Sequence, residues 1–149
     1  MSLKTEDTLA FIMTKKVITI SANEKVSKAL TLMAENDIGS LVATDKGQPV
    51  GIITERDITR RLVKNQNISK ASVRDLMSQP LVTAEPDTPS WEAFRTMLKK
   101  RIRRLPIVEK GKLVGIVTER DLFRWVLLVA YEPNIPEDIR EIVEKGYPR

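Results

Sequence analysis

The sequence predicts a mixed α/β (α+β) fold made of two copies of one β-α-β-β-α unit. The segment GIITERDI at 51–58 returns as GIVTERDL at 115–122, and this 64-residue offset holds without a gap along both halves. Within each half, β-branched runs alternate with segments whose apolar residues recur at helical spacing. A unit this small buries little surface alone, so we expect the two copies to pack through their sheets with pseudo-two-fold symmetry.

A short amphipathic helical turn opens each copy. Its apolar face is formed by Leu9, Ile12 and Met13 in the first copy, and by Val73, Leu76 and Met77 in the second. Ser72 with Asp75 forms a capping pattern for the second turn. A strand rich in β-branched residues is expected next, at 17–20 and again at 81–84.

A helix and a β-hairpin form the middle of each copy. Apolar spacings of three and four residues mark the helix from Val26 to Met33 and its counterpart at 93–97. The expected hairpin strands are 40–43 and 50–53 in the first copy, and 105–108 and 113–117 in the second. Glycine-containing turns at 45–48 and 109–112 join these strands. A closing helix starts near Thr54 and Thr118.

The repeat divides the chain into three parts. We expect the first copy with its opening helix at 1–71, the second copy at 72–131 and a C-terminal extension helix at 132–149. Pro136 and the acidic residues after it predict the start of that extension helix. Its apolar stripe must pack either on the module or on a second subunit.

Composition excludes several classes of chemistry. The chain has no cysteine and no histidine, which removes disulfides, thiolate metal sites and the side chains most used for acid–base catalysis. We therefore expect no metal site and no enzymatic activity. A net charge of +5 favours anionic partners. The longest apolar stretch is far shorter than a membrane span, so we expect a soluble cytoplasmic protein without membrane contact.

Three motifs, occurring together and in register, resemble the cystathionine β-synthase-type (CBS) domain family. They are VRDLM at 73–77, RLPIV at 104–108 and the doubled Gly-hydrophobic-hydrophobic-Thr-x-x-Asp. The resemblance runs from about residue 8 to about residue 130. Paired CBS domains, called Bateman modules, bind AMP, ADP, ATP, S-adenosylmethionine or NAD. The resemblance implies a non-catalytic regulatory module, such as an energy sensor, with an adenosine-containing ligand between its repeats and no cofactor. It also implies a homodimer and a separate regulated protein.

The doubled motif supplies the residues that the family uses for ribose. By resemblance, Asp57 and Asp121 hold the ribose hydroxyls, and Thr54 and Thr118 contact ribose or phosphate. An ionised carboxylate accepts strong, charge-assisted hydrogen bonds from vicinal hydroxyls. Thr-x-x-Asp before a helix also forms a capping box, in which the same side chains bind orphan backbone N–H groups. Both roles remain open, and one residue can fill both.

Basic residues differ between the copies. Arg103 and Arg104 match the positions directly before Leu-Pro that bind nucleotide phosphates in relatives, and a guanidinium suits phosphate oxygens. Arg56 and Arg120, next to the motif aspartates, are further phosphate candidates. The alternative for such a basic run is a solvated helix end. The first copy lacks the arginine pair, so we expect two unequal sites.

An apolar slot for adenine is the remaining part of the expected site. Its candidate residues are Ile18, Ile38 and Ile52 in the first copy, and Val82, Ile102 and Ile116 in the second. All six are also ordinary core residues by type. We expect Ile38 and Ile102 to contact the base.

Two other functions stay open. The positive charge and the cluster Lys99–Arg104 would suit nucleic acid, but aromatic residues amount to only 5% and no reader fold is recognised, so this alternative is disfavoured. A purely structural dimerisation module that has lost its ligand is the other alternative. Trp91 and Trp125 are candidates either for an interface or for the core.

Overall fold

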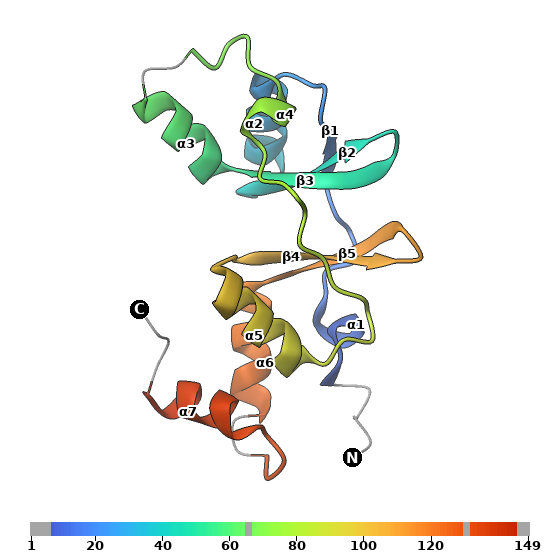
Figure 1. Cartoon of the computed structure of the whole chain (residues 1–149), viewed down its shortest axis with the longest axis vertical. Coiled ribbons are helices and arrows are strands. Elements are labelled where there is room, and N and C mark those ends of the chain that lie inside the picture. Colours follow the sequence, from blue (N-terminus) through green and yellow to red (C-terminus); the bar gives the residue numbers. More distant parts are fainter. Residues whose placement is uncertain (1–6, 65–66, 130–131, 146–149) are drawn as a thin grey trace. The chain divides into compact units, whose positions relative to one another are not determined.

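The computed structural model describes residues 7–64, 67–129 and 132–145, and it confirms a mixed fold with two repeated units (Figure 1). Each compact unit combines separate stretches of the chain. The first-copy unit comprises Lys16–Val82 and Lys110–Val114, and the second-copy unit comprises Met1–Lys15, Thr83–Glu109 and Gly115–Arg149. The opening segment of each sequence copy therefore belongs to the unit built around the sheet of the other copy.

The first-copy unit has a three-stranded sheet in the order β1-β2-β3. Strand β1 (Thr19–Ser21) pairs in parallel with β2 (Ser40–Asp45), which pairs antiparallel with β3 (Gln48–Thr54). The helices of this unit are α2 (Val26–Asn36), α3 (Glu55–Val63) and α4 (Val73–Leu76). Their apolar faces and the sheet share one core, formed by Ile20, Ala22, Val26, Ala29, Met33, Leu41, Ala43, Ile53, Ile58, Ala71, Val73 and Met77.

The second-copy unit has a similar plan with a two-stranded sheet and one additional helix. Its elements are α1 (Leu9–Ile12), α5 (Ser90–Lys100), β4 (Arg104–Glu109), β5 (Lys112–Thr118), α6 (Glu119–Val129) and α7 (Glu137–Lys145). Strands β4 and β5 form a two-stranded sheet. The large side chains that are fully buried in this unit include Leu9, Leu105, Ile107, Val117, Leu122 and Ile139.

Both hairpin turns that the sequence predicts are present, and both have a left-handed backbone. Lys46 and Gly47 have φ angles of 50° and 79°, and Lys110 and Gly111 have 50° and 78°. Two successive residues with positive φ are the mark of a type I′ turn, whose twist matches that of the flanking strands. Glycine takes this conformation without steric cost, which explains why it occupies the second position both times.

The predicted second-copy strand at 81–84 is wrong in extent. Only Ala84 pairs, through one parallel bridge to Ile107, whereas three residues pair in the first copy. The residue before Ile107 is Pro106, at the position that Val42 occupies in the first copy. Proline has no N–H to donate to a neighbouring strand, so the ladder cannot extend past the bridge toward Val82.

The opening segments attach in the same way in both units. Thr14 exchanges backbone hydrogen bonds with Ile116, at N–O distances of 2.9 and 3.0 Å. Ser78, 64 residues after Thr14, exchanges the equivalent bonds with Ile52 at 2.8 and 3.2 Å. The next residue toward the N-terminus is a methionine in each segment, and its side chain lies against a glycine of the strand.

The extension helix α7 packs on its own chain. Its residue Ile139 is fully buried. Asp138 accepts a two-pronged ion pair from Arg95 of α5, whose guanidinium carbon lies 4.6 Å from the centroid of the Trp91 ring. Trp125 is only 4% exposed, so it is a core residue of this unit.

Candidate functional site

The first Thr-x-x-Asp motif lies where β3 passes into α3. Thr54 is the N-cap of α3, and its hydroxyl accepts a hydrogen bond from the Asp57 N–H at 3.2 Å. Asp57 Oδ2 accepts from the Thr54 N–H at 2.9 Å and from the Thr54 hydroxyl at 3.0 Å. This reciprocal pair is a capping box, which satisfies backbone donors that a helix start leaves unpaired.

The second motif repeats this geometry at the start of α6. Asp121 Oδ2 accepts from the Thr118 N–H at 2.9 Å and from its hydroxyl at 3.0 Å, and the Asp121 N–H donates to that hydroxyl at 3.3 Å. The capping role is therefore confirmed in both copies. Both bonds to each aspartate use Oδ2, and both aspartates are half-buried, so Oδ1 remains outside the box. The ribose role of these residues stays a prediction.

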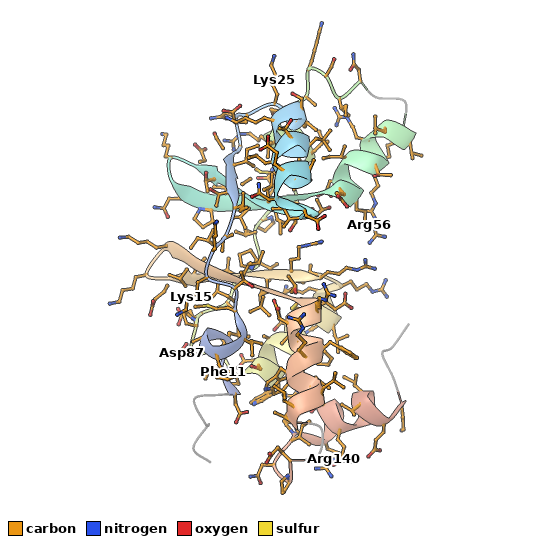
Figure 2. All side chains as sticks on the ribbon, turned by 180° about the vertical axis from the view of Figure 1, so that it is seen from behind. Phe11, Lys15, Lys25, Arg56, Asp87 and Arg140 are labelled. Carbon is orange, nitrogen blue, oxygen red and sulfur yellow. The ribbon has the colours of Figure 1, made fainter. Side chains whose placement is uncertain are left out.

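The predicted phosphate residues lie on different elements. Arg103 precedes β4 and lies beside the start of α6, with 3.8 Å between its Nε and Oε2 of Glu119. Its backbone oxygen also accepts from the Glu119 N–H at 2.9 Å. Arg104 is the half-buried first residue of β4. Arg56 and Arg120 are exposed in the first turns of α3 and α6, where Figure 2 shows Arg56.

The arginine pair therefore belongs to the same unit as the Thr118–Asp121 box. In the first-copy unit, the Glu55 N–H donates to Gly39 at 3.0 Å, and glycine brings no charge to that position. The two units therefore differ in charge at this position. Unequal sites and the phosphate role of the arginines stay predictions.

The six candidates for the adenine slot are all half-buried: Ile18, Ile38, Ile52, Val82, Ile102 and Ile116. Ile18 and Ile38 pack against the core cluster of the first-copy unit. A packing role thus accounts for these two. Contact of any of the six with a base stays a prediction.

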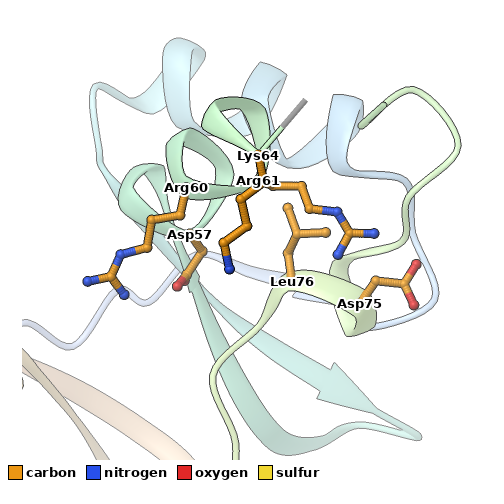
Figure 3. A pocket seen from close by; sticks show the side chains of 6 residues that line it. All are labelled: Asp57, Arg60, Arg61, Lys64, Asp75 and Leu76. Carbon is orange, nitrogen blue, oxygen red and sulfur yellow. The ribbon is translucent and has the colours of Figure 1, made fainter. Parts of the chain in front are cut away.

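A pocket that the sequence did not predict lies between α3 and α4 (Figure 3). It is lined by Asp57, Arg60, Arg61, Lys64, Asp75 and Leu76. Only Asp57 was expected at a site. The other residues come together because α4 packs on α3, a contact between segments about a dozen residues apart in the sequence.

The described residues contain no group of three or more acidic, histidine or cysteine side chains that could hold a metal ion. Throughout 7–64, 67–129 and 132–145, every helix falls short of the length and apolar character needed to cross a bilayer.

The sequence profile of the CBS domain family matches the chain twice, at residues 8–64 and 73–128. An uncharacterized protein of Methanopyrus kandleri, MK0525, is 41% identical over 134 residues, which are 88% of this chain and 65% of the relative. An uncharacterized protein of Methanocaldococcus jannaschii, MJ1404, is 37% identical over 129 residues, which are 77% of this chain and 31% of the relative. The chain thus spans less than two thirds of the length of both relatives.

A solved structure with the same fold contains adenosine compounds. It is the CBS domain pair of protein MJ0100, in complex with 5′-methylthioadenosine and S-adenosyl-L-methionine. It aligns with a TM-score of 0.72 and 31% identity, and the alignment covers 78% of this chain and 93% of that one.

Proposed function

The chain belongs to the CBS domain family, and from this premise we propose that it is a non-catalytic regulatory module that binds an adenosine-containing ligand. The two copies pair through their sheets in this proposal, and the ligand occupies the cleft between them. AMP, ADP, ATP, S-adenosylmethionine and NAD are the ligand candidates. The proposed role is to control a separate protein in the cytoplasm in response to that ligand, for example as an energy sensor.

The observation that carries this proposal is the duplicated aspartate at a strand–helix junction. In each copy, the capping box fixes the carboxylate through Oδ2 and leaves Oδ1 outside. A half-buried carboxylate with one oxygen to spare suits two vicinal ribose hydroxyls, because charge-assisted hydrogen bonds are strong. The presence of adenosine compounds in the MJ0100 structure supports the same ligand class.

Isothermal titration calorimetry with these five ligands and with methylthioadenosine tests the proposal; S-adenosylmethionine and methylthioadenosine are the phosphate-free cases. We expect a dissociation constant of about 10 μM for at least one of them. Asp57→Asn and Asp121→Asn keep a side-chain oxygen for the backbone cap but lose the charge. Each should weaken binding at its own site by about tenfold. Glu55→Gln is the matched control, since it removes an exposed charge from the same first turn. No binding of any ligand at millimolar concentration would refute the proposal.

The capping box is itself the observation that favours a purely structural role. It accounts for both Thr-x-x-Asp motifs without any ligand. If Asp57→Asn and Asp121→Asn lower the melting temperature and leave every binding constant unchanged, the structural reading is correct.

We also propose that the module forms a homodimer. Val63 of α3 is 79% exposed and Leu127 of α6 is 61% exposed, and the two occupy equivalent positions 64 residues apart. Apolar side chains exposed at both positions favour self-association. Sedimentation velocity of Val63→Glu and Leu127→Glu tests this: dissociation of a dimer supports the proposal, and a monomeric parent chain refutes it.

A further inference from the structure

The α3–α4 pocket has a volume of about 290 Å³. Sites for complete drug-sized ligands are roughly 300–1,000 Å³, so this pocket is at the lower limit. It lies wholly within the first-copy unit. Its size suits a small group, or one end of a larger ligand.

Three cations line this pocket. Arg60, Arg61 and Lys64 follow Asp57 at helical spacings of three, four and seven, which place them along one side of α3. In Figure 3, the Arg61 guanidinium extends toward Asp75, the Lys64 amine turns back toward Asp57, and Arg60 lies at the rim. Among the described residues, none of the three cations forms an ion pair within 4.0 Å. The Nε of Arg61 is also buried without a hydrogen-bond partner there.

A helix dipole alone does not explain this arrangement. Cations near a helix C-terminus are stabilised by the partial negative charge of the last carbonyl groups. That interaction needs neither a concave surface nor a buried guanidinium nitrogen. An unpartnered buried donor costs free energy, and the Arg61 Nε is such a donor beside the pocket.

The three cations of the pocket outnumber its two carboxylates, and each carboxylate is held through one oxygen by a capping box. Asp57 accepts bonds from Thr54 in its capping box. Asp75 accepts from the Ser72 N–H at 2.9 Å in the capping box of α4. The backbone N–H and the hydroxyl of Ser72 lower the pKa of Asp75, so this carboxylate stays ionised and directed at the start of its helix.

The equivalent place in the second-copy unit has different chemistry. At the 64-residue offset, Arg61 is replaced by Trp125, Lys64 by Leu128 and Asp75 by Phe11, which Figure 2 shows on α1. The indole of Trp125 is buried, whereas Phe11 is 59% exposed and Leu128 is 74% exposed. The equivalent helices of this unit, α1 and α6, also pack together. The fold therefore does not require cations at this place.

We propose that the α3–α4 pocket is a binding site for a phosphate group, with Arg61 and Lys64 as the main donors and Arg60 at its rim. Guanidinium and ammonium groups form charge-assisted hydrogen bonds to phosphate oxygens, and the fork of Arg61 can bind two of them. The phosphate belongs either to a free inorganic anion or to a nucleotide whose sugar reaches Asp57. The α1–α6 counterpart has no such capacity.

Titration of the full chain with sodium pyrophosphate, by calorimetry at low and at physiological ionic strength, tests this site. Pyrophosphate carries no adenosine and methylthioadenosine carries no phosphate, so failure here is distinguishable from failure of the proposed function. We expect Arg61→Gln with Lys64→Gln to weaken pyrophosphate binding at least about tenfold. The control Lys99→Gln with Lys100→Gln removes the same charge from the end of α5 and should change binding by less than about twofold.

A second pair of variants tests the location without touching the two main donors. Arg60 and Arg124 occupy equivalent positions in the two units, and both are exposed. Arg60→Gln should weaken pyrophosphate binding by about threefold, while Arg124→Gln should have no effect. Equal effects of these two variants, or of the two double variants, would show diffuse attraction to a positively charged chain and overturn the proposal. A melting curve for each variant identifies losses that come from unfolding.

ADP and pyrophosphate, compared on the parent chain and on Asp57→Asn, distinguish the source of the phosphate. A nucleotide ligand is indicated if ADP binds more tightly than pyrophosphate and loses that advantage with Asp57→Asn. A free anion is indicated if pyrophosphate and ADP bind equally and Asp57→Asn changes neither. Absence of binding by both phosphate compounds to the parent chain refutes the site.

Discussion

The edge between α3 and α4 and the edge between α1 and α6 are built from equivalent helices. The first carries charged side chains and the second carries apolar ones. Both place a one-turn helix beside the helix that follows a Thr-x-x-Asp capping box. The first-copy edge carries three cations around a depression, and the second-copy edge carries Phe11, Trp125 and Leu128. The capping boxes of α3 and α6 are thus the same in both copies, whereas the residues on the outer surface are not.

In both copies, the opening segment attaches to its strand through a contact between a methionine and a glycine. A Cβ at Gly51 would lie 2.7 Å from Met77 Sδ, and a Cβ at Gly115 would lie 2.6 Å from Met13 Sδ. No side chain fits at these distances, so each strand accepts its opening segment only because glycine leaves the space. The two sheets therefore share the same kind of contact where the opening segments attach.

The largest expected effect is the loss of this contact. Gly51→Ala should lower the free energy of unfolding by about 2 kcal/mol, because the new methyl group overlaps the Met77 sulfur. It also approaches the Ser78 carbonyl oxygen at 2.9 Å, whereas Gly115→Ala approaches the Thr14 carbonyl oxygen at 3.1 Å, so Gly115→Ala should cost slightly less. Urea denaturation measures both.

A double variant checks the cause of that loss. Met77→Ala should be less damaging in the Gly51→Ala background than in the parent chain, because it removes the overlapping atoms. Strictly additive losses would contradict this account of the contact.

The two capping boxes should contribute equally to stability. Thr54→Ala and Thr118→Ala each remove one N-cap hydroxyl of matching geometry, so each should cost about 1 kcal/mol of stability. Thr→Ser at the same positions keeps the hydroxyl and serves as the control. Chemical denaturation gives the comparison, and losses that differ severalfold would show that the two boxes are not equivalent.

A cation placed on the edge between α1 and α6 should give that edge part of the phosphate affinity of the edge between α3 and α4. In the Arg61→Gln, Lys64→Gln background, Leu128→Lys supplies the second-copy edge with the cation that Lys64 supplies to the first. We expect pyrophosphate affinity to rise by about threefold, since Trp125 still occupies the position of the second donor. Phe123→Lys, at another exposed apolar position of α6, is the matched control. An equal gain from both variants would contradict a defined site at this edge.

The smallest effect concerns α7, which has no counterpart in the first-copy unit. The Arg95 guanidinium holds the pKa of Asp138 below its ordinary value. The ion pair therefore stabilises the fold at pH values above that ordinary pKa of about 3.9. This contribution is lost as the pH falls through the lowered pKa. Because the pair is exposed to solvent, Asp138→Asn should cost only about 0.5 kcal/mol at neutral pH.

Melting curves recorded from neutral to acidic pH measure this contribution. The difference between the parent chain and Asp138→Asn should vanish below the lowered pKa. A constant difference at every pH would show that the ion pair does not contribute.

Much of the fold was predictable because its signals are local. The apolar spacing of Val26 to Met33 predicts α2, and the glycine-containing segments at 45–48 and 109–112 predict both turns. The strand at 81–84 was overpredicted, because β-branched composition does not report on the partner strand. There, Pro106 removes the donor that a longer ladder requires.

The candidate site was likewise predictable only where it depends on residues close together in the sequence. The Thr54–Asp57 box follows from two residues three apart, and the structure confirms it in both copies. Arg61 and Lys64 were missed because their significance depends on Asp75, which a separate segment brings to the same edge. The difference between Arg61 and Trp125 at equal positions of the repeat was a signal that could have been found.

The sequence by itself determined the duplication, the elements of each copy and the residues that cap and turn the chain. These follow from hydrophobic periodicity and short-range hydrogen bonding, which act between neighbours in the chain. Only the tertiary structure decided that Met13 packs on Gly115 and Met77 on Gly51. Both copies have the same apolar face on the opening segment and the same glycine on the strand. The sequence pattern is therefore satisfied whichever methionine packs on whichever glycine, and the path of the connecting chain decides between the two arrangements.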